Sequence, residues 1–136
     1  DEMYKTGMLN HQIAEWLTRN GYHRSKIIAD SSEQKSIADL KRNGITSITP
    51  ARKGKGSIGA GLDLISSFKV IIHPDCPNAI NEFSNYAYKK NRMTGEYTNE
   101  PQDKYNHLID ALRYALEELL HSQKKARTIS KSVLGL

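Results

Sequence analysis

The sequence predicts an α/β domain, and three observations support this class. Short apolar runs rich in β-branched residues, at positions 27–29, 45–49 and 68–72, are typical of buried strands. Segments with helical spacing separate these runs, as in strand–helix–strand crossovers of a parallel sheet. The chain has 136 residues, a length that suits one domain with a sizeable core.

The helices are predicted from apolar spacing and end signals. The first begins near residue 9, with Asn10 as its candidate cap, and stops at Asn20 and Gly21. The second, over 33–42, follows Ser31 or Ser32 as cap. The other expected segments are a helix over 58–67, a helix from Pro77, a hairpin or ordered loop over 88–98, and a last helix over 105–124 capped by Asp103.

The amino-acid composition limits the kinds of function and cellular location that suit this chain. The net charge is +5, and the stretch 40–62 contains five basic residues and no acid, which suits an anionic partner. The single cysteine, Cys76, excludes an internal disulfide and favours a reducing compartment. No apolar run approaches the roughly 20 residues that span a bilayer.

The start of the sequence shapes the expected domain division. Asp1 is not an initiator Met, and the first residues lack the basic and apolar regions of a signal peptide, so we expect a piece of a longer protein. We divide it into a partial domain over 1–124 and a basic, flexible tail over 125–136.

Asp30 is the first candidate site residue. It ends the strand at 27–29 and faces the next helix, the position where open α/β sheets place ligands. A plain loop acid explains the same residue equally well, because Asp is common in turns.

The last helix carries a second candidate acid. Helical spacing puts His107, Asp110, Tyr114 and Glu117 on one face, opposite a leucine-rich face. Such a face is ordinarily turned to water. If it converges on Asp30 instead, the carboxylates suit a hard divalent cation such as Mg²⁺, which takes oxygen ligands.

The basic stretch allows two interpretations. Gly54, Gly56 and Gly59 match the dinucleotide-binding spacing G-x-G-x-x-G, with Asp75 as the ribose-binding acid. Residues 50–53 separate these glycines from the strand, however, so we favour a flexible basic loop that meets phosphates, with Ser57 capping the next helix. The same basic residues are equally compatible with a solvent-exposed loop that binds no partner.

Three blocks, at residues 28–36, 51–58 and 106–114, together resemble the C-terminal nuclease domain of the large terminase subunit of tailed bacteriophages. The resemblance implies a ribonuclease H-like sheet flanked by helices. One acid of the family, on its first strand, has no counterpart here. The first antiparallel strands and the packaging ATPase domain are expected upstream of Asp1, and the isolated chain is not expected to assemble a competent metal pair.

The same resemblance implies a function, an endonuclease that cuts double-stranded concatemeric phage DNA by two-metal phosphodiester hydrolysis with Mg²⁺ or Mn²⁺. Asp30 and Asp110 would bind metal, and His107 would orient water or assist proton transfer. Glu33 would support the metal site without binding the ion directly. The DNA-contacting residues would be Lys35, Arg52, Lys53, Lys55 and Ser57. Implied partners are the terminase small subunit and portal protein, at the procapsid portal in the host cytoplasm. The alternatives are a non-catalytic nucleic-acid-binding module and a dinucleotide-binding domain.

Overall fold

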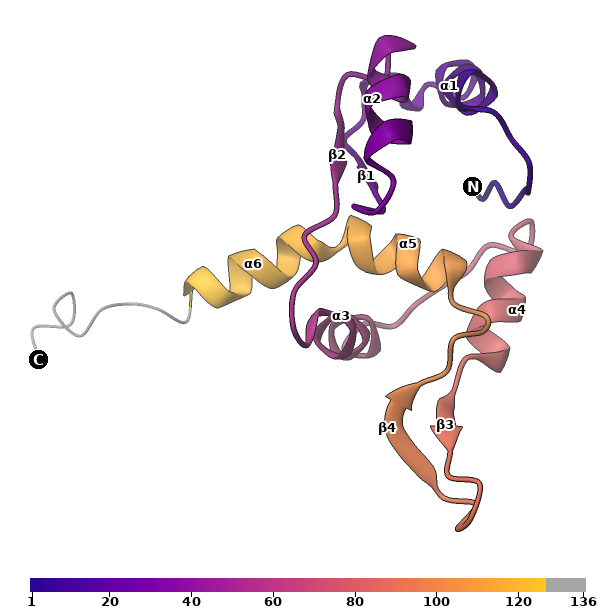
Figure 1. Cartoon of the computed structure of the whole chain (residues 1–136), viewed down its shortest axis with the longest axis vertical. Helices are drawn as coiled ribbons and strands as arrows, with labels where there is room; N and C mark the ends of the chain where they lie inside the picture. The colour runs from indigo at the N-terminus through magenta and orange to yellow at the C-terminus, as the bar shows by residue number, and fades with distance from the viewer. Residues whose placement is uncertain (127–136) are drawn as a thin grey trace, which may run out of the picture.

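The computed structural model describes residues 1–126 and confirms the α/β class, with helices flanking two small sheets (Figure 1). The expected tail lies outside the described residues from position 127 onward. The elements are, in order, α1 (Asn10–Arg19), the 3-10 turn η1 (Tyr22–Arg24), β1 (Ile27–Ala29), α2 (Gln34–Arg42), β2 (Ile48–Pro50), α3 (Ser57–Ser66), α4 (Pro77–Asn85), β3 (Tyr88–Lys90), β4 (Tyr97–Pro101), α5 (His107–Ala115) and α6 (Glu117–Ala126).

The β1–β2 pair is parallel, as predicted, with Ile27 opposite Ile48 and Ala29 opposite Pro50. The ladder continues one residue further, where the Ala51 N–H donates to the Ala29 carbonyl at 2.8 Å. Because the two strands run the same way, their carboxyl ends meet at one edge. Asp30 and the basic loop that begins at Arg52 therefore emerge side by side.

The main core lies between this pair and the helices α1 and α2. Its buried members are Ala14, Ile37, Leu40, Ile45 and Ile48, of which Ile45 and Ile48 are essentially inaccessible to solvent. Helix α5 crosses below the pair, where it contacts β1, α3 and α4, and α6, which also contacts α3, extends outward from the end of α5 (Figure 1). This crossing brings the last helices against the carboxyl edge of the strands.

Two carboxylates fix helix starts across long sequence distances. Glu2 accepts the N–H groups of Asn78 and Ala79 at the start of α4, at 3.0 and 2.9 Å. The buried Glu82 accepts those of Leu108 and Ile109 at the start of α5, at 2.7 and 3.1 Å. Such contacts satisfy N–H groups that a helix leaves unpaired in its first turn.

The predicted strand at 68–72 is wrong. Those residues form no ladder, and Phe68, Val70 and Ile71 are exposed. An isolated strand has unpaired backbone groups, so apolar composition alone does not make one. The segment 88–98 is a hairpin, β3–β4, which was one of its two expected forms. Within residues 1–126, every helix is too short or too polar to cross a bilayer.

The predicted caps are also wrong. Neither Ser31 nor Ser32 occupies the cap position of α2, Ser57 is the first residue of α3 after the cap residue Gly56, and Asn10 and Asp103 do not cap their helices. Glu33 occupies the cap position of α2, and α1 begins at Asn10 after Leu9. The last helix starts at His107 rather than 105, because Tyr105 has a φ of 55°, a left-handed conformation that a helix cannot contain. It then breaks at Leu116 into α5 and α6.

Candidate functional site

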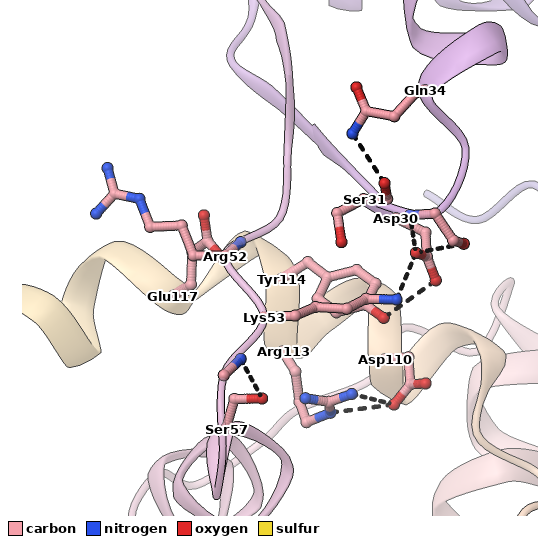
Figure 2. Close-up of polar contacts among 12 residues, drawn as sticks. Asp30, Ser31, Gln34, Arg52, Lys53, Ser57, Asp110, Arg113, Tyr114 and Glu117 are labelled. Atoms are coloured by element: carbon pink, nitrogen blue, oxygen red, sulfur yellow. Dashed lines mark hydrogen bonds and ion pairs between the residues drawn. The ribbon is translucent and has the colours of Figure 1, made fainter.

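A cavity of about 620 Å³ opens where the strand ends meet the last helices. Its walls come from Asp30, from the basic loop and the start of α3, and from α5 and α6. Both predicted acids line it, together with four of the five predicted DNA-contacting residues, Arg52, Lys53, Lys55 and Ser57. Figure 2 labels five of these residues, Asp30, Arg52, Lys53, Ser57 and Asp110.

Asp30 is oriented by its own turn and paired with Lys53. Its Oδ1 accepts the N–H and the hydroxyl of Ser32, both at 2.8 Å, and the Lys53 ammonium at 2.6 Å. The Lys53 hydrogen bond, followed by those from Ser32, holds the pKa of the Asp30 carboxyl well below its usual range. Asp30 is therefore a carboxylate at neutral pH.

Asp110 has a buried partner on its own helix. Arg113 donates to Asp110 Oδ1 from both Nε, at 3.0 Å, and Nη2, at 2.7 Å, and only 6% of its side chain is exposed. The stem of Arg113 packs against Gly61 on α3, where a Cβ would lie 2.9 Å from Arg113 Cδ. The missing side chain at Gly61 thus lets α3 approach α5 closely.

Tyr114 connects the two acids. Its hydroxyl donates to Asp30 Oδ2 at 3.3 Å, and its ring centroid lies 5.3 Å from the Arg113 guanidinium carbon (Figure 2). The Lys53 ammonium lies 5.9 Å from the same ring. Burial, and then the charge of Asp30, raise the pKa of the Tyr114 phenol, so the ring stays neutral and can donate its proton in this hydrogen bond.

The basic loop is anchored from α6. Glu117, itself buried, accepts the Arg52 N–H at 2.7 Å. The loop then turns at Gly56, whose φ of 76° favours glycine, and enters α3 without a side-chain cap. The basic loop therefore leads directly into the first turn of a helix that no side chain caps, and such a helix start suits anions.

Comparison with known proteins assigns the family. A model of the terminase RNAse H-like domain matches residues 1–118. The chain belongs to this family.

Two relatives and one solved structure illustrate how closely this terminase domain matches. It is 38% identical to the large terminase subunit of Bacillus phage SPP1 and 31% to the PBSX phage terminase large subunit of Bacillus subtilis, over 122 residues in each case. Each match covers 86% of this chain but 28% and 27% of the relative, so the chain spans just over a quarter of those proteins.

The solved structure is a crystal structure of the SPP1 large terminase nuclease domain with bound Mn. It matches with a TM-score of 0.81 and 36% identity, over 87% of this chain and 68% of the other. The ribonuclease H-like fold is therefore shown, and the terminase domain is a nuclease, hence a hydrolase, by family.

Three predicted site residues of the terminase domain lie elsewhere. Glu33 accepts the Ser36 hydroxyl at 3.2 Å, and Lys35 is exposed on α2. His107 lines a second cavity of about 370 Å³ beside Glu82, with its ring 6.1 Å from that of Tyr4. It does not line the cavity that contains Asp30 and Asp110.

The predicted polar face of the last helices is only partly turned to water, because His107 is exposed whereas Asp110 and Tyr114 are half-buried and Glu117, at the start of α6, is buried. Arg113 on α5 and Glu117 on α6 are buried and line the cavity, while Leu119 on the apolar side of α6 is 44% exposed. Arg113 was missed as a site residue, although its spacing of three from Asp110 is a signal for pairing on a helix. The sequence pattern did not indicate a role for Gly61 or Glu82, because their contacts are with residues distant in sequence.

The donor set of the terminase domain fits one divalent cation. Asp30 and Asp110 offer carboxylate oxygens to one cavity that is open to solvent, and Mg²⁺ and Mn²⁺ accept one or two carboxylates plus water or phosphate. Across residues 1–126 no three His, Cys, Asp or Glu side chains gather to form a fuller set. Two carboxylates do not by themselves hold a pair of ions.

Proposed function

We propose that this chain is the DNA-cutting part of a packaging terminase, a metal-dependent endonuclease that acts on double-stranded phage DNA. The observation that supports this most directly is the shared cavity, where two acids from a strand end and a helix lie beside Arg52, Lys53 and Lys55. Carboxylates suit the metal and the cations suit the DNA backbone.

In this proposal Asp30 and Asp110 hold the cation from two directions. Ser32 fixes the orientation of Asp30, and Arg113 occupies one oxygen of Asp110, which leaves Asp110 Oδ2 for a ligand. A bound Mg²⁺ or Mn²⁺ would polarise the phosphodiester and lower the pKa of water. The third acid that the resemblance implies would come from another part of the full-length protein.

The remaining residues take supporting roles. Arg52, Lys53, Lys55 and Ser57 contact phosphates without reading sequence. Glu33 supports the turn of Asp30, since its N–H donates to the Asp30 carbonyl at 3.1 Å. His107, which lines the neighbouring cavity, would orient water or assist proton transfer only if substrate binding brings the reacting phosphate within its hydrogen-bond reach.

The partners of the whole protein follow from the same proposal. They are double-stranded DNA, the terminase small subunit, the portal protein and the ATPase domain of the same polypeptide, acting at the procapsid in the host cell. The matches to a phage and to a PBSX protein favour a phage or prophage origin.

Calorimetric titration with Mn²⁺ tests the ligand assignment. We expect Asp30→Asn and Asp110→Asn each to weaken Mn²⁺ binding at least tenfold, because each removes one of two charged ligands. Asp63→Asn, an exposed acid on α3, is the matched control and should bind as the unaltered chain does. Unchanged affinity in either site variant would refute the assignment of that residue as a ligand.

Cleavage is tested in the full-length large subunit. The same two site substitutions should abolish Mn²⁺-dependent cutting of a supercoiled plasmid, and Asp63→Asn should not. His107→Gln should slow cutting while leaving Mn²⁺ affinity unchanged, which separates its role from that of the ligands.

A further inference from the structure

The two cavity acids have partner cations that are held very differently. Arg113 is buried, its stem is packed against Gly61, and two of its nitrogens share one oxygen of Asp110. Lys53 is 47% exposed and reaches Asp30 by a single contact from a loop. Arg113 cannot leave Asp110 without opening the helix packing, whereas Lys53 can leave Asp30 by rotating into solvent.

Asp30 keeps its orientation when Lys53 leaves. The Ser32 N–H and hydroxyl both hold Oδ1, and the Tyr114 hydroxyl holds Oδ2. The ammonium, by contrast, occupies Oδ1 as a positive charge at 2.6 Å. A divalent cation on the same carboxylate would repel it at close range, so the two cations compete for Asp30.

We propose that Lys53 is an internal competitor for the divalent cation at Asp30, and that cation binding releases its ammonium into the cavity. This inference rests on the proposed metal site. Before the cation binds, Lys53 neutralises Asp30; afterwards the freed ammonium lies beside Arg52 and Lys55, where a DNA phosphate would pass. Metal binding would then strengthen the cationic wall of the cavity.

The first test compares Mn²⁺ affinities by calorimetry. Lys53→Met should bind Mn²⁺ about fivefold more tightly than the unaltered chain, since an exposed ion pair of this kind is worth up to about that factor. Lys55→Met is the matched control, because it removes one charge from the same cavity without touching Asp30, and it should change affinity less than about twofold.

The second test observes release directly. Amine-selective acylation followed by mass spectrometry should label Lys53 several-fold faster with Mn²⁺ than without, because an ion-paired ammonium is protected. Lys41, exposed on α2, is the internal reference whose labelling should not change.

The outcomes separate the two proposals. Suppose that Asp30→Asn weakens Mn²⁺ binding, so that the metal site stands. The proposed competition is then refuted if Lys53→Met binds Mn²⁺ no more tightly than Lys55→Met does. It is also refuted if the labelling rate of Lys53 is the same with and without Mn²⁺. If Asp30→Asn leaves Mn²⁺ binding unchanged, or the unaltered chain and Lys53→Met both fail to bind, the metal site is refuted and competition with it.

Discussion

Asp30 accepts hydrogen bonds from Ser32 and forms an ion pair with Lys53, and both favour its ionised form. The Ser32 hydrogen bonds come from its own turn, whereas the Lys53 pair requires the carboxylate charge. The lowered pKa means that the folded chain holds Asp30 ionised to lower pH than the unfolded chain does. The pair therefore stabilises the fold fully above the unfolded Asp pKa, near 4, and loses that contribution as pH falls toward the folded pKa.

This dependence gives a prediction for Asp30→Asn, which removes the charge but keeps an acceptor for the Ser32 N–H. At pH 6 the variant should be less stable than the unaltered chain by less than about 1 kcal/mol, because the pair is partly exposed. The difference should shrink as pH falls from about 4 to 3. Urea unfolding at each pH measures it, and a gap that stays constant down to pH 3 would contradict the linkage.

At the scale of elements, the close approach of α3 to α5 depends on Gly61. A methyl group there would lie 2.9 Å from Arg113 Cδ and 3.2 Å from Cγ, so Arg113 must shift. Arg113 also holds Asp110, which links the packing of two helices to the geometry of the acid.

We therefore expect Gly61→Ala to destabilise the fold by about 1–3 kcal/mol, as overpacking does, and to weaken Mn²⁺ binding. Gly59→Ala on the same helix is the control, since nothing lies within 4 Å of its added methyl group. It should be neutral or stabilise the helix by up to about 1 kcal/mol. Thermal unfolding and Mn²⁺ titration of both variants measure the two effects. If the two variants have the same stability and the same Mn²⁺ affinity, Arg113 accommodates the methyl group without cost.

The elements also show what sequence could predict. Apolar spacing located the helices, and β-branched runs located β1 and β2, because those signals are local. The strand expected at 68–72 failed because a ladder needs a partner, which composition does not reveal. The two acids and the basic loop were recognisable as motifs, but the pairing of Lys53 with Asp30, 23 positions away, depends on the packing of whole elements.

For the whole molecule, the chain carries a net charge of +5, and three of its basic residues, Arg52, Lys53 and Lys55, line the cavity together. Each phosphate contact made by a cation releases counterions, so DNA affinity should fall with salt. Arg52 suits a test, because Glu117 holds its backbone and a side-chain substitution leaves that anchor in place.

Arg52→Gln should make the slope of log affinity against log salt less steep by about 0.9, the value for one phosphate contact. Lys41→Gln, away from the cavity, should leave the slope unchanged. Fluorescence anisotropy with two duplexes of unrelated sequence measures both variants. A loss confined to one duplex would indicate base readout instead of backbone contact.

The position of Tyr114 has a practical consequence. Its hydroxyl touches Asp30 and its ring adjoins the guanidinium that holds Asp110, whereas the chain's one tryptophan, Trp16, lies on α1 with its ring 5.8 Å from that of Tyr22. A fluorinated tyrosine at position 114 would thus serve as a built-in spectroscopic reporter. Its fluorine resonance would register the arrival of an ion or a nucleotide while both carboxylates remain chemically untouched.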